Sequence, residues 1–371
     1  MENSTSHPSL PLNQILHGDC VELLDTLPSA SVDLIFADPP YNLQLQQELW
    51  RPNMTRVDAV NDGWDQFSSF EAYDQFSRGW LAACRRVLKD SGTIWVIGSY
   101  HNIYRIGTIM QDLGYWFLND IVWVKTNPMP NFRGVRFTNA HETLLWAARA
   151  KGSRYTFNHH AMKALNHDKQ MRSEWVIPIC SGVERLRLNG RKAHSTQKPE
   201  ALLYRVLLSS SRPGDVVLDP FFGSGTTGVV ARRLHRHWLG IEQEAAYIEI
   251  AARRIATVTP APYLDDVFDV SDKKRLAPRV PFSRLLEFGL LLPGQTLYFQ
   301  TDRQIEAKIK PNGKLLLQNG FEGSIHQVGR HLLNGSPCNG WQLWNYIDGA
   351  GQLRLIDHLR DIVRNKYASG A

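Results

Sequence analysis

A glycine-rich turn between a predicted strand and a predicted helix restricts this chain to a small set of folds. The apolar residues 216–218 predict a buried strand, and Gly223, Gly225 and Gly228 follow it at the start of a helical pattern. Glu242 lies 19 residues after Gly223, at the end of the next predicted strand. A strand, a glycine turn, a helix and an acid in this order are typical of the nucleotide-binding unit of open α/β sheets.

The segment 15–256 alternates strand-like and helix-like stretches, which predicts an α/β fold with a doubly wound parallel sheet. Strands are predicted at 32–37, 93–97, 121–125, 143–147, 216–218 and 238–241. Helices are predicted at 76–88, 103–113, 199–209, 226–234 and 246–257. Only one predicted strand follows the glycine turn, and the segment 15–19 supplies the next unit from the start of the chain. This order is that of a circular permutation.

The tetrapeptide Asp38-Pro39-Pro40-Tyr41 directly follows the predicted strand at 32–37. Neither proline has an N–H group to donate to a sheet, so the strand ends here and the carbonyls of Asp38 and Pro39 point out of its end. A carboxylate, a free carbonyl and an aromatic ring at this place suit the binding of an exocyclic amino group on a flat base. An ordinary strand-to-turn junction is the alternative, because Asp-Pro and Pro-Pro are common in turns.

Two kinds of cofactor fit the glycine turn. A nicotinamide or flavin dinucleotide is one, with Glu242 on its ribose hydroxyls. S-adenosylmethionine is favoured, because Asp219 precedes the glycines, where a carboxylate binds an α-amino group but repels a pyrophosphate. The late position of the turn in the chain, and Asp19 at the end of the permuted strand, favour the same cofactor.

Three motifs in this order, Asp38–Tyr41, TQKP at 196–199 and DPFFGSGTT at 219–227, resemble the amino-methyltransferases of DNA of the permuted, beta class. A closer resemblance, to the cell-cycle-regulated DNA adenine methyltransferases of alphaproteobacteria, rests on GSYHNIYR (98–105), NPMPNFRG (127–134), QMRSEW (170–175) and CNGW (338–341). The resemblance implies a Rossmann-like methyltransferase sheet with a small C-terminal DNA-binding domain. It further implies methylation of adenine N6 in GANTC sites of duplex DNA, linked to DNA replication.

The resemblance also assigns roles to the tetrapeptide. The carboxylate of Asp38 and the carbonyl of Pro39 would accept the two N6 hydrogens, and Pro40 would keep the turn rigid. Tyr41 would stack on the target base after it leaves the duplex. The methyl group would transfer in line, without a covalent enzyme intermediate. Methylation of cytosine N4 is the nearest alternative, and a nucleotide-dependent oxidoreductase is the alternative from another class.

Candidate binding residues surround these motifs and the irregular segments. The cofactor S-adenosylmethionine, and its product S-adenosylhomocysteine, are expected to contact Asp19, Cys20, Asp38, Lys198, Asp219, Phe221, Phe222, Gly223, Gly225, Thr226 and Glu242. Asp19 is assigned to the adenine, Glu242 to the ribose and Lys198 to the carboxylate of this cofactor. DNA contacts are expected from Leu43, Leu45, Arg51, Arg133, Arg185, Arg187, Ser324, Asn339 and Trp341. Packing on their own domain is the alternative for the two leucines.

The net charge of +6 lies in the last part of the chain. Residues 1–270 hold 28 basic and 28 acidic side chains, whereas residues 271–371 hold 14 and 8. A basic segment of this kind predicts a polyanion partner. We expect an N-terminal tail at 1–14, a catalytic domain at 15–258 with an irregular target-recognition region at 127–195, a linker at 259–281 and a DNA-binding domain at 282–371.

Composition argues against a metal site, a secreted protein and a membrane protein. The four cysteines lie far apart, which favours reduced thiols and argues against a zinc site, and no metal is expected. The first residues lack the pattern of a signal peptide, and no apolar run is long enough for a membrane span. We therefore expect a cytoplasmic, nucleoid-associated enzyme that acts on double-stranded DNA, and the resemblance favours a homodimer.

Overall fold

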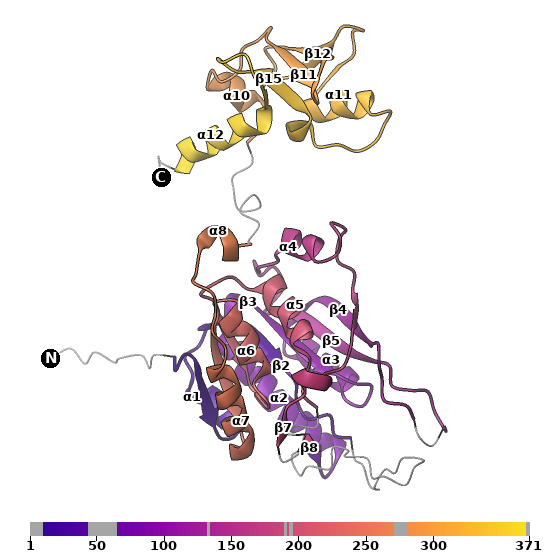
Figure 1. Ribbon diagram of the computed structural model, residues 1–371, viewed down its shortest axis with the longest axis vertical. Helices are drawn as coiled ribbons and strands as arrows, with labels where there is room; N and C mark the ends of the chain where they lie inside the picture. The colour runs from indigo at the N-terminus through magenta and orange to yellow at the C-terminus, as the bar shows by residue number, and fades with distance from the viewer. Residues whose placement is uncertain are drawn as a thin grey trace, which may run out of the picture. The chain divides into compact units, whose positions relative to one another are not determined.

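A mixed β-sheet forms the centre of the larger unit (Figure 1). The computed structural model describes residues 10–43, 65–131, 134–188, 191–192, 196–270 and 280–368. Within these residues the sheet has eight strands, in the spatial order β1 (Gln14–His17), β10 (His237–Glu242), β9 (Val216–Asp219), β2 (Val32–Ala37), β3 (Leu88–Gly98), β5 (His141–Ala148), β4 (Trp116–Lys125) and β6 (Glu174–Ile177).

The first five strands of this order are parallel, and the pairing confirms the permuted topology. Ile15 of β1 lies opposite Gly240 of β10, so the start of the chain extends the sheet beyond the glycine turn. β10 pairs with β9, β9 with β2 and β2 with β3 in the same direction. The remainder differs from the prediction of a wholly parallel sheet, because β4 and β5 form an antiparallel hairpin and β5 also runs antiparallel to β3.

The irregular region predicted at 127–195 holds more regular structure than its sequence suggests. β5 lies within it, as the strand predicted at 143–147, and β6, which was not predicted, pairs in parallel with β4. The remaining elements of the region are α4 (His159–Ala164), the 3-10 helix η2 (Gly182–Glu184), β7 (Arg187–Leu188) and β8 (Arg191–Lys192). Tertiary pairing, rather than local periodicity, therefore determines much of this segment.

Two apolar cores cover the two faces of the sheet, because successive residues of a strand point to opposite faces. In β2, Leu34 and Phe36 belong to one core, and Ile35 and Ala37 belong to the other. The second core includes side chains of α1 (Cys20–Thr26), α2 (Phe70–Val87) and α3 (Ile103–Asp112). The first includes α4 and also α5 (Glu200–Ser210), α6 (Thr226–Arg233) and α7 (Ala245–Ala256). The sheet is thus doubly wound, as predicted.

Close packing explains the glycines of the turn after β9. Gly225 has a φ of +73° immediately before α6, and a side chain there would lie 2.8 Å from the Cβ atom of Ala251. A side chain at Gly228 would meet Ile255 and the ring of Phe222 at under 3 Å. The glycines therefore let α6 pack against α7 while the turn stays narrow at the edge of the sheet.

Part of the predicted linker belongs to the larger unit. The chain divides into two units between Asp272 and Lys273. Before this boundary, the short helix α8 (Asp265–Phe268) places the ring of Phe268 4.3 Å from the ring of His235. Val270 packs against the core of the larger unit. The described residues up to 270 are therefore attached to the larger unit and do not form a free spacer.

The smaller unit has its own sheet and core. Its described strands form an antiparallel sheet in the order β14 (Glu322–Gly323), β13 (Leu315–Leu317), β12 (Asp302–Ile309), β11 (Thr296–Phe299), β15 (Trp344–Ile347) and β16 (Leu353–Leu355). Its helical elements are α10 (Ser283–Glu287), α11 (Ile325–Leu332), the 3-10 helix η3 (Gly340–Gln342) and α12 (Ile356–Ala368). Leu285, Val328, Trp344 and Val363 are fully buried in its core. This is the α+β domain predicted from the sequence.

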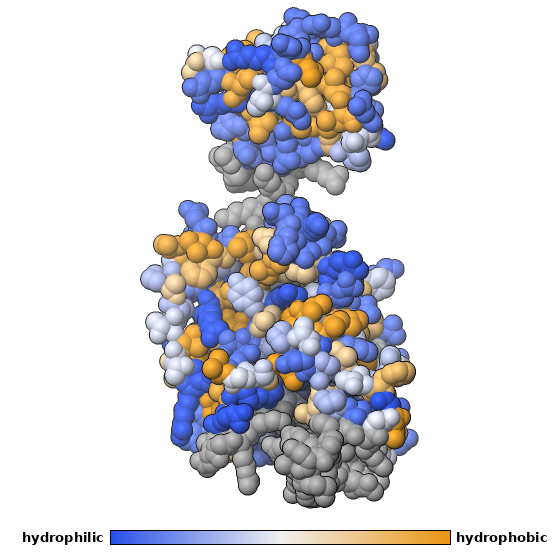
Figure 2. All heavy atoms as spheres, turned by 45° about the vertical axis from the view of Figure 1, so that its right-hand side comes forward, coloured by the Kyte–Doolittle hydropathy of each residue, from blue (hydrophilic) through white to orange (hydrophobic). Residues whose placement is uncertain are grey.

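The surfaces of both units are mixed in character. Figure 2 shows hydrophilic side chains across the visible face of each unit, with apolar areas between them. Where the chain is described, no helix combines the length and the apolar character that crossing a membrane requires.

Candidate active site

The carboxyl ends of four parallel strands bring the predicted motifs together at one edge of the sheet. Asp38 follows β2, Asp219 ends β9, Glu242 ends β10 and Asp19 follows β1. Because these strands are neighbours and run in the same direction, their carboxyl ends face the same side. Residues separated by more than 200 positions in the sequence therefore lie around one site.

A cavity opens at this edge and is lined by residues of both motifs. Of the predicted cofactor residues, its lining includes Asp19, Cys20, Asp38, Phe221, Gly223 and Glu242. Pro39, Pro40, Tyr41 and Leu43 also line it. The lining further contains residues that were not predicted from the sequence, namely Asp65, Gln66, Phe67, Phe76, Gln243, Glu244 and Tyr247. Aromatic rings and carboxylates thus share one cavity.

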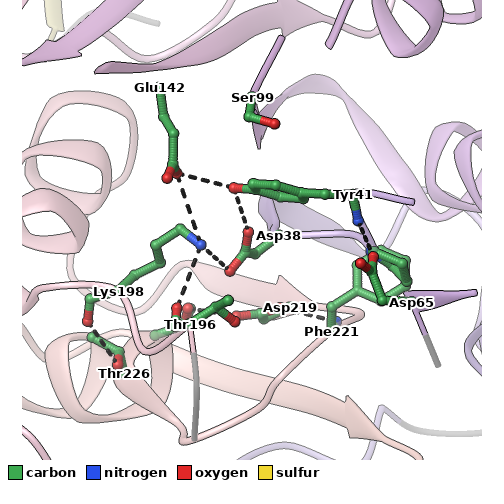
Figure 3. Close-up of polar contacts among 12 residues, drawn as sticks. Asp38, Tyr41, Asp65, Ser99, Glu142, Thr196, Lys198, Asp219, Phe221 and Thr226 are labelled. Carbon is green, nitrogen blue, oxygen red and sulfur yellow. Dashed lines mark hydrogen bonds and ion pairs between the residues drawn. The ribbon is translucent and has the colours of Figure 1, made fainter. Parts of the chain in front are cut away.

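Four side chains, of which Lys198 is buried and the others partly buried, form a polar cluster around the tetrapeptide (Figure 3). Lys198 Nζ lies 2.6 Å from Asp38 Oδ2, and the Tyr41 hydroxyl lies 3.1 Å from Asp38 Oδ1. The same hydroxyl lies 3.0 Å from Glu142 Oε2, and Lys198 Nζ lies 3.9 Å from that oxygen. The hydroxyl and the ammonium group therefore lie between two carboxylates. Lys125 completes the cluster through a 2.7 Å contact with Glu142 Oε1.

Burial and ion pairing shift the pKa values in this cluster. Burial raises the pKa of Asp38, and the nearby charge of Lys198 opposes that rise without cancelling it. Burial acts on Glu142 in the same sense, but Lys198 and Lys125 outweigh it and lower the pKa of Glu142. Burial disfavours the charged form of Lys198, yet Asp38 and Glu142 raise its pKa. Lys198 is thus a buried cation held by two acids, not a solvated surface lysine.

Hydrogen bonds on both sides fix the backbone of the tetrapeptide. Asp65 accepts the N–H groups of Tyr41 at 2.6 Å, Asn42 at 2.8 Å and Leu43 at 3.0 Å. On the other side, the Tyr73 hydroxyl donates to the carbonyl of Pro40 at 2.8 Å. The carboxylate and the hydroxyl together hold the turn that follows β2, including Asn42 with its φ of +54°.

Several predicted cofactor residues build the glycine turn and do not line the cavity. The carboxylate of Asp219 accepts the Phe221 N–H at 3.0 Å and the Thr227 hydroxyl at 2.6 Å, and burial raises its pKa to about 7. Thr226 donates its hydroxyl to the carbonyl of Lys198 at 3.3 Å. The prediction for Phe222 needs correction, because its ring is buried and stacks on a core tryptophan instead of facing the cavity.

Glu242 has a structural role at the cavity wall. Its carboxylate accepts the N–H of Gly223 at 2.7 Å and that of Glu244 at 2.8 Å. These bonds join the end of β10 to the glycine turn after β9. Asp19 caps α1 in a similar way, with Oδ1 accepting the N–H groups of Val21 and Glu22. Both acids therefore keep fixed positions beside the cavity.

The predicted DNA-contacting residues have different surroundings. Leu45, Arg51 and Arg133 lie outside the described residues. Arg187 is exposed, whereas Arg185 donates from its guanidinium to the carbonyl of Cys180 at 2.8 Å.

In the smaller unit, the residues predicted to bind DNA have roles in the fold. Ser324 caps α11 by accepting the Gln327 N–H, and Asn339 accepts the N–H of Trp341. The Trp341 ring is buried, with the guanidinium carbon of Arg360 4.6 Å from its centre. Its indole therefore contributes to the core and is not available to stack on a base. Asn339 is the exposed member of the three.

The sequence interpretation missed Asp65 and Glu142. Glu142 is the second residue of β5, a strand that continues into a buried apolar run, and an acid next to such a run is a signal of a buried polar role. Asp65 lies far from the tetrapeptide in the sequence, beyond an irregular segment. Its hydrogen bonds with the backbone of Tyr41 and Asn42 are evident only in the folded chain.

The fold and the site together define a DNA methyltransferase. The family described as DNA methylase, of the N6 and N4 type, matches residues 32–253, and the chain belongs to this family. The family described as Restriction Enzyme Adenine Methylase Associated matches residues 269–369. The two matches correspond closely to the two structural units.

Individual relatives agree with this assignment. The type II methyltransferase M.HinfI of Haemophilus influenzae is 48% identical over 355 residues, covering 94% of this chain and 96% of that protein. The type II methyltransferase M2.DpnII of Streptococcus pneumoniae is 43% identical over 242 residues, or 65% of this chain and 88% of that protein. The solved PvuII DNA methyltransferase, which is cytosine-N4-specific, shares the fold, with 20% identity, a TM-score of 0.51 and coverage of 68% and 88% of the two chains.

Proposed function

We propose that this chain transfers a methyl group from S-adenosylmethionine to N6 of adenine in double-stranded DNA. The observation that carries the proposal is that Asp38 and Pro39, adjacent in the sequence, both line the cavity. These two acceptors follow each other on a rigid turn, so both can receive hydrogens from one amino group. The family match to adenine methylase-associated sequences at residues 269–369 supports adenine over cytosine.

The lining of the cavity suits S-adenosylmethionine better than a dinucleotide. Five acidic residues line it, namely Asp19, Asp38, Asp65, Glu242 and Glu244. Such an environment attracts a sulfonium ion and an amino group but repels a pyrophosphate. Phe221 and the other rings offer flat surfaces for the adenine of the cofactor. The bound cofactor supplies an electrophilic methyl group on its sulfonium.

The chain's own residues activate the adenine nitrogen in this proposal. The N6 lone pair is delocalised into the ring, and hydrogen bonds to Asp38 and Pro39 favour a pyramidal nitrogen on which it is localised. The Tyr73 hydroxyl occupies the carbonyl of Pro40, so the carbonyl of Pro39 is the acceptor presented beside Asp38. After transfer the nitrogen is positively charged and acidic, and Asp38 is the acceptor positioned for its proton.

Access to N6 requires the adenine to leave the duplex. Unstacking one base costs a few kcal/mol, which apolar side chains beside the site can partly offset. Leu43 lines the cavity and is placed for this role, with Tyr41 as the proposed stacking partner. We assign phosphate contacts to Arg187 and to the basic residues of the smaller unit. Asn339, whose side chain is exposed in that unit, is proposed as a further DNA contact. GANTC is the target that the sequence resemblance favours, and a homodimer linked to DNA replication and the cell cycle belongs to the same proposal.

Methyl transfer to defined duplexes tests the function. The full chain is incubated with tritiated S-adenosylmethionine and duplexes that contain GANTC, a scrambled site or no adenine in the site. We expect label in N6-methyladenine of the GANTC duplex after digestion to nucleosides. Label in N4-methylcytosine would replace adenine by cytosine as the target, and label with no site preference would refute GANTC. Absence of transfer to any DNA would overturn the proposal.

A further inference from the structure

The carboxylate of Asp38 is already engaged on both of its oxygens. Oδ1 receives the Tyr41 hydroxyl and Oδ2 receives the Lys198 ammonium group. The charge-assisted bond of 2.6 Å to Lys198 draws negative charge from the carboxylate and makes it a weaker acceptor for an incoming amino group. Asp38 would accept the amino group more strongly if Lys198 could move away from it and stay paired inside the protein.

A buried cation cannot lose its partner without a large penalty. The side chain of Lys198 is 8% exposed, so water does not replace the carboxylate as Lys198 moves away. Glu142 Oε2 lies 3.9 Å from Lys198 Nζ, on the side away from Asp38 (Figure 3). A small movement of the ammonium group would exchange one carboxylate for the other and keep the charge paired.

We propose that Glu142 is a positioning residue for methyl transfer, which takes over Lys198 and the Tyr41 hydroxyl when Asp38 turns to the N6 amino group. This inference rests on the proposed function. Glu142 suits the role because its second oxygen is held by Lys125 at 2.7 Å, which leaves Oε2 directed into the site. Both residues lie on the β4–β5 hairpin, whose paired strands fix their backbone. The acceptor for Lys198 is therefore preorganised.

The experiment compares Glu142→Gln with the wild-type full chain in single-turnover methyl transfer. Glutamine keeps the shape but removes the charge, so Lys198 should stay on Asp38. We expect the rate at saturating substrates to fall about tenfold to a hundredfold, the scale of a misplaced catalytic group. Binding of S-adenosylmethionine, measured by calorimetry, should change less than twofold. Glu249→Gln is the matched control, because Glu249 is an exposed acid of α7 paired with Arg253.

The pH dependence of the rate separates positioning from simple destabilisation. The charged or titratable groups that face Glu142 and Lys198 are Asp38, Tyr41, Lys125 and Arg185. Glu142 raises the pKa of Asp38, so its loss should lower that pKa and move the acid limb of the rate profile to lower pH. The shift requires the charge of Glu142 to act on Asp38, so an unmoved limb in the folded variant counts against the inference.

A second variant keeps the inference testable if Glu142→Gln folds poorly. Lys125→Met combined with Glu142→Gln removes both partners of the ion pair, which avoids an unpaired buried lysine at position 125. We expect this double variant to fold and to remain slow. A rate within threefold of wild type in either folded variant, with an unmoved acid limb, overturns the inference. Lack of methyl transfer by the wild type would instead refute the proposed function.

Discussion

The ammonium group of Lys198 is bonded to Asp38 Oδ2 at 2.6 Å, and the side chains are only 8% and 15% exposed. The carboxylate proposed for catalysis is thus paired with a cation before any base reaches it. Lys198 was expected at the carboxylate of the cofactor, whereas the structure places its ammonium group between Asp38 and Glu142. This residue connects the motif at 196–199 with the tetrapeptide.

Asp38→Asn should abolish catalysis and spare cofactor binding. The amide keeps the size of the side chain but presents a weaker acceptor to N6, so we expect the methyl-transfer rate to fall about a hundredfold or more. Cofactor affinity, measured by calorimetry, should change less than about threefold, because most of the cavity lining comes from other segments. Equal losses of rate and cofactor affinity would contradict this division of roles.

Asp65→Asn should loosen the tetrapeptide. Asparagine retains one carbonyl oxygen, but its NH2 group cannot accept the N–H groups that the carboxylate now accepts with both oxygens. We expect a loss of about 1–3 kcal/mol in the free energy of unfolding, measured in urea, together with a lower rate of methyl transfer. Asp112→Asn, which removes half of an exposed pair with Arg78, is the control and should stay near wild type.

Asp219 should make the free protein less stable as the pH rises. Burial raises its pKa from 3.8 to about 7, so the folded chain keeps a proton there that the unfolded chain has released. Between about pH 4 and pH 7 the unfolded state binds fewer protons at this site, and stability falls through that window. Asp219→Asn should remove about 3 kcal/mol of this fall between about pH 5 and pH 8, because about two pH units of the window lie above pH 5. Urea unfolding at these two pH values measures the difference in stability, and an unchanged difference in the variant would refute the assignment.

Phe221 and Phe222 should behave oppositely when each is changed to alanine. Phe221 lines the cavity, so its loss should weaken cofactor binding, by about tenfold if one ring contact is lost. Phe222 stacks on Trp238 in the core, so its loss should lower the free energy of unfolding by about 3–5 kcal/mol. Calorimetry and urea unfolding separate the two effects. A large loss of cofactor affinity in a stable Phe222→Ala variant would support the original prediction that Phe222 contacts the cofactor.

Removal of residues 271–371 should weaken DNA binding and flatten its dependence on salt. The whole net positive charge lies in that segment, and each lost phosphate contact lowers the slope of log affinity against log salt by about 0.9. The division between Asp272 and Lys273 gives the larger unit its own core. Fluorescence anisotropy at several salt concentrations provides the measurement. Unchanged affinity and slope would exclude a DNA role for the smaller unit.

The two motifs made most of the fold predictable. A strand that ends at Asp38 and a glycine turn after Asp219 are both determined by neighbouring residues, so the sequence alone indicates them. The permuted order followed from counting strands on either side of the turn. The cluster around Asp38 was not predictable in full, because Glu142 and Lys125 reach it through hairpin pairing between strands.

Burial explains the other differences. Phe221 and Phe222 are adjacent residues of the same type. The sequence alone therefore does not show that Phe221 lines the cavity while Phe222 packs in the core. Gly240 leaves room for the Phe222 ring in the core, because a Cβ atom at position 240 would lie 2.4 Å from that ring. Trp341 is a similar case, since a tryptophan near polar residues suits both a binding surface and a core.

The antiparallel direction of β5 has a consequence for how such enzymes can diversify. The segment that joins β4 to β5 begins after Lys125 and ends before His141, at the same edge of the sheet as the site. The bond from the Lys125 N–H to the Ala140 carbonyl closes the base of this segment and keeps Lys125 and Glu142 in register. Residues between 126 and 139 can therefore be inserted or exchanged while the ion pair at its base keeps its place.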